Sequence, residues 1–121
     1  MEKRIRNYQS EVINKKIIEE FSIAKKMYSK RKYNECFFHL ERLHVLGQRS
    51  VYWHTVAHFY MLRVGFVTFN FSEIVGQLLR LPLGILGSLA GVVPVGNTGG
   101  SNVGMFRKMD IPADLALYLE D

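Results

Sequence analysis

Residues 33–43 read YNECFFHLERL, and residues 71–81 read FSEIVGQLLRL. The two stretches align at an offset of 38 residues, with an aromatic residue at the start of each and Glu35 opposite Glu73. Self-similarity at a fixed offset favours stacked pairs of helices over any sheet. Helices that merely share common helix-forming residues would produce the same match, so both explanations stay open.

The rest of the chain shows the same helical periodicity, with apolar residues three or four positions apart. Four segments carry it: residues 11–28, 33–47, 51–67 and a segment that opens at Ser72. No stretch shows the strict alternation that is typical of strands. An aromatic residue just before an acid and an apolar helix resembles the inner joint of tetratricopeptide-type hairpins. We therefore predict an all-α fold of antiparallel helical hairpins with tetratricopeptide-like stacking and a Gly-rich apolar C-terminal segment.

The length of 121 residues predicts a single helical domain over residues 1–121, because a chain of this size can bury one core. We divide it into a basic N-terminal helix (1–32), paired helices that carry the histidines (33–81), and a Gly/Pro-rich segment with the C-terminal tail (82–121). In the tail, Pro112 predicts a turn that is followed by a last short helix.

From Leu81, the residue before the Gly/Pro-rich segment, the sequence reads LPLGILGSLAGVVPVGNTGG. Its apolar run is short and contains Pro82 and Pro94, so we expect no membrane span but a short apolar helix against the core and then an ordered loop. The loop lacks the lysine of a phosphate-binding P-loop. Its glycines are expected to adopt positive φ angles in a folded-back segment; they are Gly96, Gly99 and Gly100.

The net charge of +5 is concentrated in residues 1–32, which hold ten Lys/Arg against four acids. Aromatic residues do not alternate with these charges, so we expect a solvated helix face and no specific nucleic-acid binding. The single cysteine, Cys36, cannot form an internal disulfide, which suits a reducing compartment. The first sixteen residues contain no apolar signal region. We therefore expect a cytoplasmic protein.

All four histidines lie within residues 39–58. Helical spacing places Glu41 and His44 on one face of the second helix, and His54 and His58 on one face of the third. If the two helices are antiparallel, the turn between them brings these two faces opposite each other. Imidazole and carboxylate donors suit zinc or iron. The spacing thus predicts one transition-metal site with Glu41, His44, His54 and His58 as ligands.

His39 lies about 140° around its helix from His44, on the side of Glu35. We expect His39 and Glu35 to be neighbours of the site or parts of a polar outer face, and not direct ligands. Two other interpretations of the cluster stay open: a structural set of packed polar side chains, or catalysis without a metal.

Several motifs together resemble a bacterial family known as domain of unknown function 3703. They are HLERLHVLGQRS, the following His54 and His58 with MLRVG, then EIVGQLLRL, VPVGNTGG and MDIPADL. The likeness spans roughly residues 24–119. It implies a recurrent set of histidines and a recurrent GNTGG loop, and no assigned activity.

The function we expect is that of a small metal-binding protein, for storage, sensing or delivery of a transition metal and less so for catalysis. The alternative is a helical-repeat interaction module, which binds a protein partner or a second copy of itself while the histidines merely pack. A third class, weak nucleic-acid binding by the basic first helix, would require an affinity that falls steeply with salt.

Overall fold

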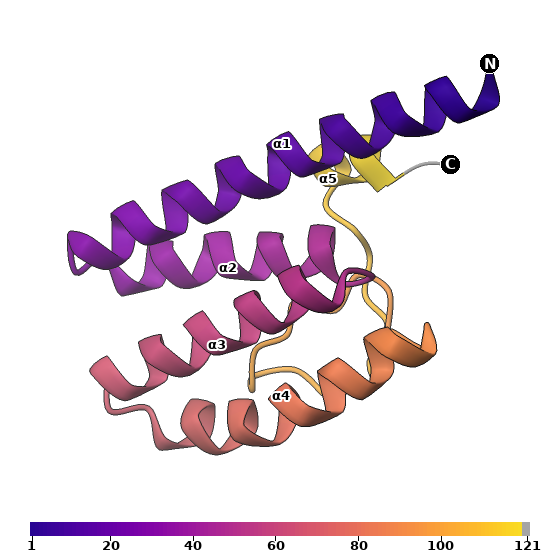
Figure 1. Ribbon diagram of the computed structural model, residues 1–121. Coiled ribbons are helices and arrows are strands. Elements are labelled where there is room, and N and C mark those ends of the chain that lie inside the picture. The colour runs from indigo at the N-terminus through magenta and orange to yellow at the C-terminus, as the bar shows by residue number, and fades with distance from the viewer. Residues whose placement is uncertain (120–121) are drawn as a thin grey trace.

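The computed structural model describes residues 1–119 and contains five α-helices (Figure 1). They are α1 (Glu2–Ser29), α2 (Tyr33–Gly47), α3 (Val51–Val67), α4 (Phe71–Ala90) and α5 (Ala113–Leu119). Over these residues there is no strand, so the predicted all-α class is confirmed. The last two residues of the expected third segment, 120–121, lie outside the described residues.

Helices α1 to α4 lie side by side in chain order, and each runs antiparallel to the one before it (Figure 1). Close packing joins α1 to α2, α2 to α3 and α3 to α4, while α5 packs on α1 and α2. The two aligned stretches of the sequence each begin a helix, at Tyr33 and at Phe71. This is an open stack of helical hairpins; its likeness to tetratricopeptide stacking in detail stays a prediction.

The hydrophobic core lies mainly between α1, α2 and α3. Its largest fully buried apolar side chains are Leu40, Leu43, Met61 and Leu115, and the thiol of Cys36 is buried among them. Burial of a side chain of this size stabilises the fold by roughly 1.5–3 kcal/mol. The first ten residues are exposed, and α1 extends past the core there.

Helix α4 continues beyond the boundary at residues 81/82 that divides the expected segments. The Asn70 side chain caps its start by accepting a hydrogen bond from the backbone N–H of Glu73 (3.1 Å). Pro82 lies inside the helix, where it removes one backbone hydrogen bond. The helix ends at Gly91, whose φ of 71° is a left-handed conformation that favours glycine. The predicted short apolar helix is therefore the second half of α4.

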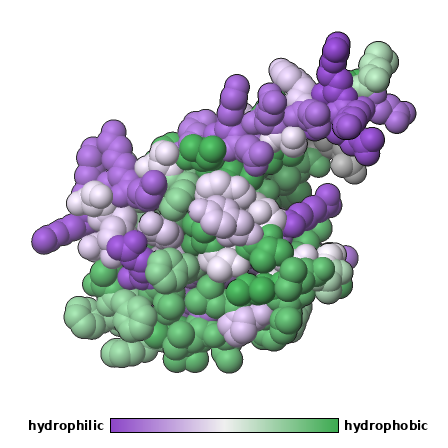
Figure 2. Space-filling view, in the orientation of Figure 1, coloured by the Kyte–Doolittle hydropathy of each residue, from purple (hydrophilic) through white to green (hydrophobic). Residues whose placement is uncertain are grey.

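The two faces of α4 are unusual in their polarity. Its inner face buries Glu73, Gln77 and Arg80. Its outer face exposes large apolar side chains, which are Phe71, Val75, Leu78, Leu79, Leu83, Leu86 and Leu89. Figure 2 shows this surface as green over the position of α4, opposite the hydrophilic surface of α1. Within the described residues, α4 is the one helix that is long and apolar enough to cross a membrane, judged by length and composition alone.

A long loop follows α4 and runs back past α2 and α3 before it reaches α5 (Figure 1). The side-chain amide of Asn97 donates to the carbonyl oxygens of Gly104 (2.9 Å) and Arg107 (2.7 Å), which folds the loop on itself. Gly96 and Gly99 have positive φ angles, as expected. Gly100 does not, so the expectation for that residue was wrong.

Candidate metal centre

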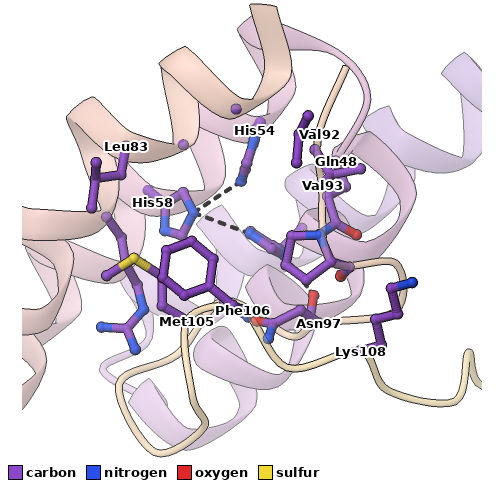
Figure 3. Close-up of a pocket in the computed structure, with 16 residues that line it drawn as sticks. Gln48, His54, His58, Leu83, Val92, Val93, Asn97, Met105, Phe106 and Lys108 are labelled. Carbon is purple, nitrogen blue, oxygen red and sulfur yellow. Dashed lines mark hydrogen bonds between the residues drawn. The ribbon is translucent and has the colours of Figure 1, made fainter. Parts of the chain in front are cut away.

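Three of the four histidines converge between α2, α3 and α4. His44 comes from the last turn of α2, and His54 and His58 are one turn apart on α3. The Nε2 atom of His58 lies 3.1 Å from Nε2 of His44 and 3.1 Å from Nε2 of His54 (Figure 3). The ligand nitrogens of the three residues, which are all buried, lie within 4.8 Å of one another. We call these residues the histidine triad.

The opposite ring nitrogen of His44 is held by the loop after α4. Its Nδ1 lies 2.6 Å from the backbone carbonyl oxygen of Asn97. A carbonyl oxygen can only accept, so Nδ1 of His44 carries the proton and donates it. The Nε2 atom of the neutral ring is then left with a free lone pair.

A similar contact from α4 fixes the ring of His54. Its Nδ1 lies 2.5 Å from the hydroxyl oxygen of Ser88, and that hydroxyl donates to the backbone carbonyl of Gln48 (3.1 Å). Because the only hydroxyl proton of Ser88 is used for Gln48, its oxygen accepts from Nδ1–H of His54. The lone pair of His54 is therefore also on Nε2.

Gln77 fixes the third ring. The Nε2 amide group of Gln77 donates to a carboxylate oxygen of Glu73 (2.7 Å) and to the carbonyl oxygen of Gly99 (2.9 Å). Those two acceptors identify the other amide atom as oxygen, and it lies 2.6 Å from Nδ1 of His58. His58 thus donates from Nδ1, and all three Nε2 lone pairs of the triad face one another.

Burial keeps the triad neutral. It lowers the pKa of His54 to about 4, and with the charge on His54 it lowers the pKa of His58 to about 4. The pKa of His44 falls well below its usual value, because the ring is buried and because His58 and His54 are so close. Near pH 7 the three rings are therefore neutral, and no proton lies between their Nε2 atoms.

Three convergent imidazole lone pairs are a donor set that can hold a transition-metal ion. Zinc–nitrogen bonds of 2.0–2.1 Å in tetrahedral geometry separate the ligand nitrogens by roughly 3.4 Å. The two contacts of 3.1 Å from His58 are close to that separation. The hydrogen bonds from Nδ1 to Asn97, Ser88 and Gln77 are the outer contacts that orient histidine ligands in metal proteins.

A cavity of about 300 Å³ opens beside the triad. All three histidines line it, together with Arg80. Its apolar wall is formed by Leu83, Val92, Val93, Pro94, Met105 and Phe106. Val92 and Phe106 are exposed, so the cavity reaches the protein surface there. A metal ion held by three histidines would thus have an accessible fourth position.

The structure does not place Glu41 with the triad, although the sequence predicts it as a ligand. Glu41 lines a different cavity, together with Glu73 and Thr68. Burial raises the pKa of Glu41, and the charge on Glu73 raises it further, while the nearby Thr98 opposes this. Glu41 lies one helical turn before His44 on α2. Its carboxylate is next to Thr98 of the loop and not next to the three imidazoles.

His39 faces α1 instead. Its Nδ1 lies 2.6 Å from the carboxylate of the buried Glu20, which also accepts a hydrogen bond from Arg42 (2.8 Å). Burial raises the pKa of Glu20, but these two hydrogen bonds together outweigh it and leave the pKa below its usual value. Arg42 also forms an ion pair with Asp114, so that it connects α2 with both α1 and α5. Glu35 is exposed on the surface of α2.

Sequence reasoning missed the three residues that orient the triad: Gln77, Ser88 and Asn97. A signal for two of them was present, since Gln77 and Ser88 are polar side chains within the apolar sequence of α4. Asn97 acts through its backbone carbonyl, which any residue type would supply, so no side-chain pattern could reveal it.

Comparisons with known proteins identify one relationship. A family model described as "Protein of unknown function (DUF3703)" matches residues 11–119, which confirms the resemblance seen in the sequence motifs. No curated protein and no solved structure matches the chain.

Proposed function

The chain belongs to the DUF3703 family, and we propose that it is a small metal-binding protein that holds one transition-metal ion on the triad of His44, His54 and His58. Zinc is the first candidate, and iron the second. The role is the storage, sensing or delivery of that ion in the cytoplasm.

One observation supports this proposal above all others, which is the orientation of the three lone pairs. A buried cluster that served only for packing gains from hydrogen bonds between its own members. Here each ring directs its single N–H outward, to Asn97, Ser88 or Gln77, and keeps an unprotonated nitrogen in the centre. A buried polar atom without a partner is costly, and a cation would satisfy all three at once.

The donor set supports zinc before iron. Three neutral imidazoles with one open position match the three-histidine zinc sites of proteins, whereas non-haem iron sites commonly pair two histidines with a carboxylate. No carboxylate residue lines the cavity of the triad within the part of the chain that the structure describes.

Metal analysis of tag-free protein tests the proposal. We expect about one equivalent of zinc after loading and desalting, and loss of most of it in His54→Ala and in His58→Ala. His39→Ala is the matched control, because this ring contacts Glu20 and should leave the zinc content unchanged. Zinc should also raise the melting temperature of the wild type but not of the two triad variants, since an ion that binds only the folded state stabilises it.

Absence of bound metal in the wild type, after loading with either zinc or iron, would refute the proposal. So would retention of zinc by both triad variants together with its loss from His39→Ala. A structural polar cluster would then be the better interpretation of the triad.

The outer face of α4 favours a second candidate function, that of an interaction module. Seven large apolar side chains are exposed on this one helix, and patches of this kind commonly mark contacts with other proteins. The first partner to test is a second copy of the chain. Sedimentation velocity over a range of concentrations should show a dimer that Leu79→Glu abolishes. A monomer at every concentration would remove self-association as the function of this face.

A further inference from the structure

The cavity beside the triad has an unbalanced charge. Arg80 lines it and is only 9% exposed, and Lys108 is the other charged residue in its wall. The wall contains no aspartate or glutamate, and within residues 1–119 no carboxylate pairs with Arg80. A buried charge is costly unless it is paired. A divalent ion on the neutral triad would add two further positive charges to the same space.

The guanidinium of Arg80 is held in place but not neutralised. Its Nη2 donates to the backbone carbonyl oxygen of Val103 (3.0 Å). Gly76 leaves room for it, since a Cβ atom there would lie 2.6 Å from Nη1 of Arg80. Arg80 lines the same cavity as the three imidazoles. The structure thus fixes a cation near the three imidazoles without a protein anion to match it.

The remaining wall of the cavity is apolar and leaves space next to the triad. Gly84 of α4 faces His54 and His58, and a Cβ atom there would lie 3.3 Å from Nε2 of His54. Leu83, Met105 and Phe106 line the same space. Its volume of about 300 Å³ is far larger than a water molecule or an inorganic anion needs.

We propose that this cavity binds a small organic carboxylate with a short aliphatic chain. One carboxylate oxygen takes the open fourth position on the metal ion. The other accepts a hydrogen bond from Arg80, whose positive charge the carboxylate offsets, and the aliphatic chain lies against the apolar wall. This inference rests on the proposed function, because the carboxylate binds to the metal that the triad holds.

Cobalt(II) in place of zinc provides the test, because its visible spectrum changes when a ligand in its coordination shell is exchanged. Acetate, propionate and butyrate are added to the cobalt-loaded protein, with propionamide as the neutral control. We expect saturable spectral changes with the three carboxylates and none with propionamide. The affinity should rise about three- to fourfold with each added CH₂ group, as expected for burial of the chain in an apolar cavity.

Arg80→Gln should weaken propionate binding by about tenfold or more, the usual scale for the loss of a charge-assisted hydrogen bond. It should leave cobalt binding unchanged or tighter, because a nearby positive charge has gone. Arg107→Gln is the matched control. This exposed arginine lies between Phe106 and Lys108 in the loop, but it does not line the cavity. There, propionate binding should stay as in the wild type.

The outcomes separate the two proposals. If the wild type binds cobalt but its spectrum responds to none of the carboxylates, the carboxylate proposal is overturned and the metal site stands. Equal propionate affinity in Arg80→Gln and the wild type also overturns it. If the wild type binds no cobalt, both proposals fail. Should Arg80→Gln not fold, the chain-length series in the wild type still decides.

Discussion

Replacing Gly99 with alanine tests how closely the glycine-containing loop fits the histidine triad. Gly99 has a φ of 87°, a conformation that side chains rarely adopt. An added Cβ atom would lie 2.6 Å from Cδ2 of His44 and 2.8 Å from its Nε2. The substitution therefore acts on the backbone of the loop and on a proposed metal ligand at the same time.

The magnitude follows from these two effects. The left-handed backbone costs about 1–2 kcal/mol for a residue with a Cβ atom. Ordinary contact begins near 3.4 Å, so the His44 ring must move by about 0.8 Å, and the short hydrogen bond from its Nδ1 to Asn97 is weakened. Loss of that bond adds about 1–2 kcal/mol. We expect the metal-free protein to lose about 2–4 kcal/mol of unfolding free energy, and zinc affinity to fall about 10- to 100-fold.

Gly91→Ala separates the two effects, because Gly91 also has a positive φ (71°) but no atom lies within 4 Å of the added Cβ. It should cost only about 1–2 kcal/mol for the left-handed backbone and leave zinc affinity unchanged. Urea unfolding of the metal-free proteins measures the first quantity, and competition with a chromophoric chelator measures the second. If Gly99→Ala is no less stable than Gly91→Ala and binds zinc within threefold of the wild type, the close contact between this loop and the triad is refuted.

Four further predictions concern the triad and the two buried acids Glu20 and Glu41. Ser88→Ala removes the acceptor for His54 and should weaken zinc binding about 10- to 100-fold by chelator competition, whereas Ser72→Ala, exposed at the start of the same helix, should have no effect. Glu20→Gln should destabilise the protein by about 2–3 kcal/mol in urea, with unchanged zinc affinity; an unchanged midpoint would contradict the Glu20 network. Glu41→Gln should leave zinc affinity within twofold of the wild type, because Glu41 lines a different cavity. A large loss of zinc affinity would show that Glu41 is a ligand after all. As pH falls from 6.5 towards 4, the histidines of the unfolded chain bind protons, whereas the buried triad stays neutral. The unfolding free energy of the metal-free protein, measured by urea titration, should therefore decrease by up to about 1.4 kcal/mol per pH unit for each histidine. A flat profile over this range would show that the rings are not buried and neutral.

The helices could be predicted from the sequence because apolar periodicity and capping residues are local signals. The expected segments 33–47 and 51–67 match the bounds of α2 and α3. The signal at the start of α3 is local, because the Ser50 hydroxyl accepts a hydrogen bond from the backbone N–H of Trp53 (3.3 Å). The first turns of α1 show no apolar periodicity, because residues 2–10 are helical but exposed and have no buried face. Pro82 suggested a break, yet α4 continues through it, because one lost backbone hydrogen bond does not outweigh the packing of the helix on α3.

The candidate site could be predicted only in part. His54 and His58 share one helix face at a spacing of four, so their proximity needed no knowledge of the tertiary structure. Placing His44 and Glu41 required the rotation of α2 relative to α3, which spacing alone does not set. His44 turns to the triad, and Glu41 turns to Glu73. The contacts from α4 and the loop cross 19 to 53 residues of sequence, too far for any local pattern to show them.

The three histidines of the triad lie within 15 residues of sequence, and their outer contacts come from parts of the chain that follow. The loop that α2 and α3 must close is short, so the entropy lost in bringing the ligands together is small. During synthesis or refolding, the ion that we propose for the triad can therefore meet all three imidazoles on the α2–α3 hairpin before α4 has docked. Metal present at that moment would act on the folding rate, whereas metal added later would act only on the lifetime of the folded state. For the proposed ion, the timing of metal supply would then decide which of the two steps it controls.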